Sequence, residues 1–156
     1  MSKDLILGLD LGTSSIKAIL IDQSGTLIKK SEAKLPIRRF DNQVEQDCNE
    51  YKRALIEITT ECQDFLLRIA AIGLSGQTPS LLGIDDFGNP TFPTLIWQDN
   101  RANLEAQELE REFGNPWNLI GTSLPWSASA CPAKMLWISR NNPHWISKTR
   151  WLLQPK

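Results

Sequence analysis

The sequence has little of the chemistry that marks metal and thiol sites. Its 156 residues contain one histidine and three cysteines, which stand at positions 48, 62 and 131. No Cys-x-x-Cys pair exists, and the sequence offers His144 no acid–base partner. A structural zinc site needs four such ligands at short spacings. This scarcity argues against a zinc site, and we expect three reduced, mostly buried thiols and a surface histidine.

An excess of one charge and a long apolar run are also missing. The formal net charge is -1, so the charge favours neither nucleic acid nor an anionic membrane as a partner. The apolar runs are far shorter than the roughly 20 residues that cross a bilayer, and the first residues do not read as a secretory h-region. We expect a cytoplasmic protein. The length and the 41% of hydrophobic residues suit one domain with a buried core.

The first half of the chain has the clearest periodicity. Apolar residues predict a strand over 5–11, and β-forming residues that alternate around Lys17 predict a second over 15–22. Lysines and Glu32 favour a more exposed edge strand over 26–35, and a polar connection follows over 36–46. A helix then begins after Asp47, an N-cap with a glutamate three residues on, which is capping-box spacing. Its apolar side chains recur at intervals of three and four residues: Tyr51, Ala54, Leu55, Ile58, Cys62, Phe65 and Leu66.

Shorter elements follow. We expect the helix to end near Arg68 and a strand over 69–75 to be buried on both faces. We then expect a strand over 80–85, a turn over 86–90 and an extended segment over 95–97. A helix should run from an Asp99 cap to about Phe113, where Gly114 stops it, and an irregular stretch should follow over 115–131. The last elements are a helix from Pro132 to about Arg140 and a strand from Trp151. Because a buried strand normally feeds into a turn or helix, we expect the chain to be cut inside a domain.

A Gly-Thr-Ser turn follows an acidic residue at the end of the first strand. Gly12 lets an anion approach the backbone, and successive N–H groups in such a turn form an anion-binding concavity. Thr13 and Ser14 add hydroxyl groups, and Asp10 can hold Mg²⁺ directly or through its waters. The pattern predicts a phosphate site, with a plain hairpin as the alternative. Lys17 is expected to face solvent.

Six segments in chain order resemble the FGGY family of carbohydrate kinases, part of the actin-like ATPase superfamily, and are close to the bacterial xylulose kinases. They are Gly8–Ser14, Val44–Asp47, Ile72–Gln77, Ile96–Arg101, Lys134–Trp137 and Leu152–Lys156. The resemblance implies an α/β fold of the actin-like ATPase (ribonuclease H-like) type, a mixed sheet with flanking helices. It implies that residues 1–156 are the front part of the N-terminal domain, truncated, without the C-terminal adenosine-binding domain.

The same resemblance implies a reaction. A kinase of this family would transfer the γ-phosphate of ATP to a hydroxyl of a pentulose or a related sugar or polyol, with ATP and Mg²⁺ as cofactors. The catalytic Asp10 would hold the metal, and Gly12, Thr13 and Ser14 would meet the β- and γ-phosphates. The general base lies outside this chain, so we expect the chain alone to be inactive. A sheet cut open leaves unpaired backbone, so a homodimer is a further expectation.

The sugar side is implied by the later segments. Gln77 and Thr78 would approach sugar hydroxyls, Trp97 would supply an apolar wall, and Asp99 and Arg101 would hydrogen-bond the sugar or organise the site. The alternatives for the last three are core packing, helix capping and pairing with a neighbouring carboxylate.

One feature of the sequence leaves the sugar open, and two alternative functions remain. Xylulose kinases carry Met-His, and glycerol kinases Arg-Glu, where this chain has Thr78–Pro79, so the resemblance does not identify the sugar. A non-catalytic binding or regulatory module that retains the fold is the second hypothesis. A third, an actin-like or chaperone-like ATPase, has no need of the sugar-side segments around Gln77 and Trp97.

Overall fold

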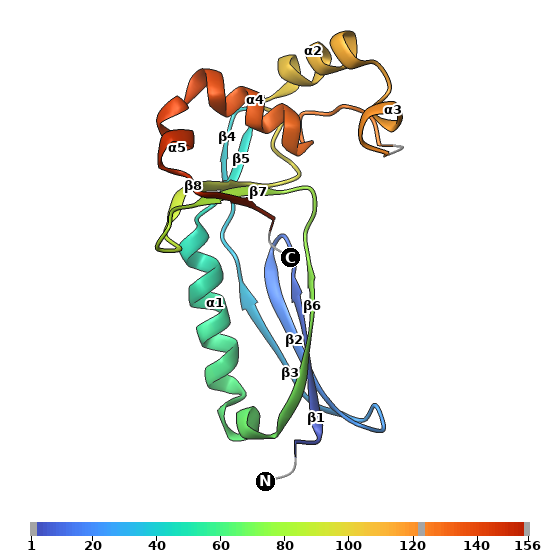
Figure 1. Ribbon diagram of the computed structural model, residues 1–156. Helices are drawn as coiled ribbons and strands as arrows, with labels where there is room; N and C mark the ends of the chain where they lie inside the picture. The colour runs from blue at the N-terminus through green and yellow to red at the C-terminus, as the bar shows by residue number, and fades with distance from the viewer. Residues whose placement is uncertain (1–2, 122–123, 155–156) are drawn as a thin grey trace. The chain divides into compact units, whose positions relative to one another are not determined.

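The computed structural model describes residues 3–121 and 124–154. These residues form two compact units. Unit 1 comprises residues 3–36 and 47–77, and unit 2 comprises residues 37–46, 78–121 and 124–154. Figure 1 shows the helices and strands of each unit. No described helix has the length and apolar character needed to cross a membrane.

Unit 1 contains a four-stranded mixed sheet with the strand order β3-β2-β1-β6. Its strands are β1 (Leu5–Leu11), β2 (Ser15–Asp22), β3 (Leu27–Lys34) and β6 (Ile69–Gly76). The first three pair antiparallel in chain order, whereas β6 runs parallel to β1. The predicted bounds of β1 and β2 are confirmed, because two apolar, β-forming runs on either side of a Gly-Thr-Ser turn are a local signal for a hairpin.

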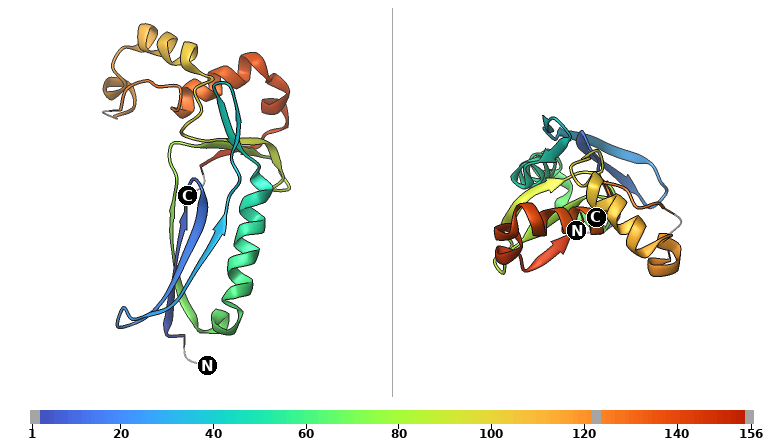
Figure 2. Two further views of the ribbon diagram at one scale, coloured as in Figure 1. Left: turned by 180° about the vertical axis from the view of Figure 1, so that it is seen from behind. Right: turned by 90° about the horizontal axis from the view of Figure 1, so that it is seen from above.

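A long helix covers one face of this sheet (Figures 1 and 2). Helix α1 (Cys48–Glu61) starts at the predicted cap, Asp47, whose side chain accepts from the N–H of Asn49. It ends earlier than predicted, because a 3-10 segment, η1 (Gln63–Arg68), takes over the last turns. The buried core between helix and sheet consists of Leu5, Leu7, Ile16, Ala18, Leu20, Ala33, Leu35, Ala54 and Ile58.

Strand β6 differs from the sequence-based expectation. We expected burial on both faces, yet Ile72 is 63% exposed and Leu74 is 58% exposed. Among the described residues β6 pairs only with β1, and α1 packs on β2 and β3. An apolar run is typical of a strand with neighbours on both faces, and the described part of unit 1 does not supply them.

Unit 2 contains a five-stranded sheet with the order β4-β5-β8-β7-β9, in which every pair is antiparallel. Its strands are β4 (Arg38–Phe40), β5 (Gln43–Gln46), β7 (Leu81–Ile84), β8 (Pro90–Leu95) and β9 (Trp151–Leu153). Its helices are α2 (Asn103–Phe113), α3 (Pro116–Ile120), α4 (Cys131–Asn141) and α5 (Pro143–Lys148). The core of the unit gathers Leu81, Phe92, Leu95 and Ile138, with Trp145 stacked on Phe92.

Three predictions for unit 2 were wrong. The stretch predicted as a polar connection over 36–46 holds the β4–β5 hairpin, which turns at Asp41 with a φ of 51°. The stretch predicted as irregular contains α3, capped by Asn115. Helix α2 begins after Ala102 without a side-chain cap, so Asp99 is not its N-cap.

The three cysteines of the chain are free: Cys62 is buried, and Cys48 and Cys131 are partly buried.

Candidate functional site

The predicted phosphate turn is the connection between β1 and β2. The N–H of Gly12 donates to the Ser15 carbonyl at 3.0 Å, which closes the turn. A Cβ atom on Gly12 would lie 3.0 Å from that carbonyl oxygen and 3.8 Å from Oδ2 of Asp10. The space that glycine leaves is therefore bounded by the turn and the Asp10 carboxylate, which suits the close approach of a ligand to the backbone.

Asp10 lies at the end of β1 and is exposed. Its register partner on β2 is Lys17, which is exposed as predicted. Both residues line an open hollow of about 470 Å³ on the sheet, together with Gly8, Ile19 and Gly73 among others. The carboxylate is therefore accessible to a ligand and is not packed in the interior of unit 1.

The donors around Asp10 fit one kind of metal site. The described residues include no group of three or more histidine, cysteine or acidic side chains that could enclose a metal ion. Mg²⁺ is commonly held by one or two carboxylates together with water and substrate phosphates. A single exposed carboxylate beside a glycine turn fits Mg²⁺ held jointly with a phosphate chain, and it does not fit a metal held by protein ligands alone.

Gln77 reaches the same edge of the sheet as this turn. Its preceding residue, Gly76, pairs with Leu11, and the N–H of Gln77 donates to the Leu11 carbonyl at 2.9 Å. The side chain is 8% exposed, and its Nε2 donates to the hydroxyl of Tyr51 at 2.7 Å. The structure thus brings Gln77 and the Gly12 turn together at the ends of β1 and β6. The hydrogen bond that the amide donates to Tyr51 orients the amide group.

The other sugar-side candidates belong to unit 2. Thr78 is exposed, precedes a cis peptide bond to Pro79, and donates from Oγ1 to Oε1 of Gln154 at 2.8 Å. Trp97 follows the fully buried Ile96 and is itself 45% exposed. An indole exposed to this degree presents an apolar surface to a ligand, so Trp97 is not a core residue of this unit.

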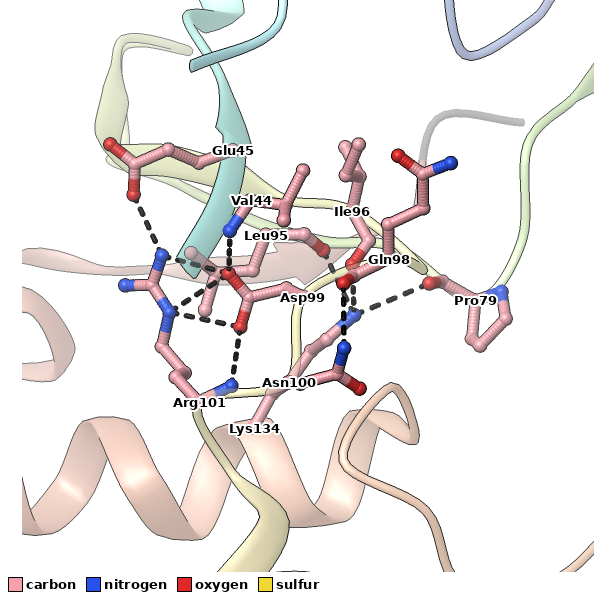
Figure 3. Close-up of polar contacts among 10 residues, drawn as sticks. All are labelled: Val44, Glu45, Pro79, Leu95, Ile96, Gln98, Asp99, Asn100, Arg101 and Lys134. Atoms are coloured by element: carbon pink, nitrogen blue, oxygen red, sulfur yellow. Dashed lines mark hydrogen bonds and ion pairs between the residues drawn. The ribbon is translucent and has the colours of Figure 1, made fainter. Parts of the chain in front are cut away.

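Asp99 and Arg101 form a buried ion pair (Figure 3). Asp99 has no exposed surface, and its carboxylate accepts from the Val44 N–H at 2.6 Å. It also accepts from the Arg101 side-chain Nε at 2.9 and 3.0 Å and from the Arg101 backbone N–H at 3.2 Å. These bonds occupy the carboxylate, so Asp99 organises the loop after β8 and ties it to β5.

Arg101 extends this cluster to two further residues. Its Nη2 lies 2.9 Å from Oε2 of Glu45, and its guanidinium stacks over the Trp137 ring, 5.0 Å from the centroid. A guanidinium with two carboxylate partners and an aromatic face is well satisfied away from water. Of the two roles expected for Arg101, the geometry favours organising the site over direct contact with a sugar.

Three residues of this cluster were not assigned a role from the sequence. Glu45 and Trp137 hold Arg101, and the ammonium of Lys134 donates to main-chain carbonyls beside the loop (Figure 3). All three lie in segments that resemble the FGGY family, and that resemblance was the only sign in the sequence of a role for them. Their partners lie tens of residues away in the chain, and no local pattern reveals such contacts.

Several known proteins are similar to this chain over nearly its whole length. A xylulose kinase from Lactococcus lactis subsp. lactis (strain IL1403) is 32% identical over 156 residues, which cover 97% of this chain and 31% of that protein. The crystal structure of a xyloylose kinase from Brucella ovis matches with a TM-score of 0.88 at 29% identity, over 97% of this chain and 32% of the other. A gluconate kinase from Lactobacillus acidophilus matches with a TM-score of 0.85 at 25% identity, over 96% and 31%.

The chain thus spans about a third of the length of the relatives it matches. The fold of the solved relatives is the predicted actin-like ATPase type, which confirms the fold class. Residues 5–156 match the N-terminal domain of the FGGY family of carbohydrate kinases. The chain belongs to this family.

Proposed function

We propose that this chain is the front part of the N-terminal domain of a xylulokinase-like sugar kinase. The whole protein transfers the γ-phosphate of ATP to a hydroxyl of a pentulose or a related sugar or polyol. The observation that carries the proposal is the exposed Asp10 beside the Gly12 turn, in a chain whose family membership spans residues 5–156. Phosphoryl transfer depends mainly on positioning and on stabilising charge, and the turn offers both to a phosphate chain.

On the phosphate side, the proposal gives Asp10 the metal and the turn the phosphates. Mg²⁺, when bound, would neutralise charge on the phosphate chain. Gly12 leaves room for a phosphate oxygen at the backbone, and Thr13 and Ser14 offer hydroxyl groups beside it. Ser14 is exposed, and its own carbonyl is held by the Leu35 N–H at 2.9 Å. This hydrogen bond fixes the turn to Leu35, the residue that follows β3.

On the sugar side, the proposal separates contact from support. Gln77, Thr78 and Trp97 are the residues that would meet the sugar, since each presents an amide, a hydroxyl or an exposed ring. Asp99 and Arg101 support them, because their ion pair is buried and fixes the loop that carries Trp97. The residue that deprotonates the sugar hydroxyl is not assigned within this chain.

The proposal extends to partners and compartment. A sugar or polyol and ATP are the small-molecule partners, and neither nucleic acid nor a membrane takes part. The protein would work in the cytoplasm, where ATP is abundant. A homodimer is part of the proposal, and sedimentation of the purified protein would test it.

The experiment is a substrate screen of the full-length kinase that contains this chain. Sugar-dependent ADP release is measured with D-xylulose, L-ribulose, glycerol and gluconate. We expect one of these acceptors, a pentulose first, to raise ADP release well above the ATPase rate without sugar. ADP release that no acceptor stimulates would contradict the proposal and would favour a non-catalytic module with the same fold.

A further inference from the structure

The amino group of Lys134 occupies an unusual position in unit 2. The residue lies in the first turn of α4 and has no exposed surface. A cation in the first turn of a helix faces the positive end of the helix dipole, and burial removes the ammonium from water, which disfavours its charged form. Burial lowers the pKa of Lys134 to about 8. By local rules an apolar side chain suits this position better, so another interaction must favour the lysine.

That interaction is a set of three main-chain carbonyls (Figure 3). The Nζ atom of Lys134 lies 3.3 Å from the Pro79 oxygen, 3.0 Å from the Leu95 oxygen and 2.9 Å from the Ile96 oxygen. An ammonium group has three donors and no acceptor, so these carbonyls use its full capacity. Within the part of the chain that the structure describes, no carboxylate lies within ion-pair distance of this Nζ.

The three carbonyls lie beside the residues proposed to meet the sugar. Pro79 directly follows Thr78, and Ile96 directly precedes Trp97. The Ile96 carbonyl also accepts from the Asp99 N–H at 3.0 Å, so Lys134 bonds to the same oxygen that closes the turn leading to the Asp99–Arg101 ion pair. One side chain therefore joins two loops that are 16 or more residues apart in sequence.

We propose that Lys134 is a positioning residue, which holds the Thr78–Pro79 and Ile96–Arg101 loops in the arrangement that binds the sugar. The inference rests on the proposed function, since it names what organises the same site. Lys134 touches neither reacting group. It acts through the main chain, and a displacement of about 1 Å of a substrate-binding group is enough to cost a large factor in rate.

The test compares three variants of the full-length kinase. Lys134→Met keeps an unbranched side chain, one heavy atom shorter, and removes the charge. Lys134→Arg keeps the charge, and the exposed Lys148→Met is the matched control in the same unit. We expect Lys134→Met to raise the KM for the sugar about tenfold or more and the KM for ATP less than about twofold, because the loops belong to the sugar side. Lys134→Arg should recover part of the sugar affinity, and Lys148→Met should match the wild type.

A pH profile tests the inference without any substitution. The charged and titratable groups facing Lys134 are Cys131, Asp99 and Arg101. As the ammonium loses its proton above about pH 8, one of three carbonyls loses its donor, and the wild-type KM for a neutral sugar should rise between pH 7 and pH 9. The same profile should be flat for Lys134→Met. Equal profiles, or a sugar KM that Lys134→Met leaves unchanged, would overturn the inference while leaving the kinase proposal intact.

Amide hydrogen exchange separates failure of the inference from failure of the proposed function. If the wild type shows no sugar-dependent turnover at all, the proposed function fails, and exchange still reports on the loops. The amide of Asp99 should then exchange faster in Lys134→Met than in Lys148→Met, at equal global stability. Equal exchange in both variants would show that Lys134 does not hold the loop.

Discussion

At the scale of single residues, burial separates the candidates that can bind a ligand from those that support them. Asp10 is exposed beside a turn where a Cβ on Gly12 would crowd the Ser15 carbonyl, whereas Asp99 is fully buried and bonded to Val44 and Arg101. The position of Asp10 at the end of β1 beside the turn follows from the sequence, because strand, acid and turn are neighbours in the chain, and its role at the phosphates stays a prediction. The sequence misplaced Asp99 as a helix cap, because the Val44 partner lies 55 residues away and leaves no local trace.

The pKa of Lys134 gives a residue-scale prediction about stability. Burial lowers this pKa to about 8 from the ordinary lysine value of 10.5, so between those pH values the unfolded chain binds more protons than the folded chain. The free energy of unfolding must then rise with pH in this window, by at most about 1.4 kcal/mol per pH unit. Below pH 8 both states are protonated, and the burial penalty is present in full.

Urea denaturation of the wild type and of Lys134→Met between pH 7 and pH 10.5 measures this effect. The stability of the wild type relative to the variant should increase from pH 8 upward. Burial raises the pKa of Cys131 and the nearby Lys134 lowers it, so both proteins are compared in a Cys131→Ala background. A stability difference that stays constant with pH would mean that the folded and unfolded pKa values of Lys134 are equal.

At the scale of elements, local patterns predicted some boundaries and missed others. The β1–β2 hairpin and the start of α1 follow from two β-forming runs around a turn and from a cap, which are properties of neighbouring residues. The β4–β5 hairpin was missed because its sequence is polar and its strands are short. The exposed faces of β6 were missed because an apolar run does not tell which neighbours the strand has.

The cap of α1 offers a prediction at this scale. Asp47 accepts from the N–H of Asn49 at 2.9 Å and from its Nδ2 at 3.1 Å. Replacing Asp47 by alanine should lower the free energy of unfolding by about 1 kcal/mol, since the first helical turn loses its side-chain acceptor. Urea denaturation measures the loss. Asp64→Ala, an equal change of charge at an exposed position of η1, is the control, and an equal loss in both variants would contradict the capping role.

At the scale of the whole molecule, the two compact units divide the proposed work. Unit 1 carries the Asp10 turn and Gln77, and unit 2 carries Thr78, Trp97 and the buried cluster around Arg101. The relatives are about three times as long as this chain. Binding energy from remote parts of a substrate helps to position its reacting centre, so the remaining length of a kinase matters for catalysis.

The 156-residue chain alone should therefore lack useful turnover. Sugar-dependent ADP release from the purified chain, compared with that of the full-length kinase at equal molarity, measures this directly. We expect the chain to fall more than about tenfold below the full-length protein, because positioned acid–base groups outside it contribute factors of 10² or more. Comparable turnover in both proteins would place the complete catalytic machinery within residues 1–156.

The central claim is that Asp10 serves the phosphate chain of the nucleotide. Its most direct test is sugar-dependent ADP release by the full-length kinase carrying Asp10→Ala, with Asp86→Ala as the control, since the Asp86 side chain is 75% exposed in the turn between β7 and β8. The account predicts that Asp10→Ala lowers turnover by at least about a hundredfold, with an unchanged circular dichroism spectrum, while Asp86→Ala stays near the wild type. Turnover within about threefold of the wild type in Asp10→Ala would contradict the claim.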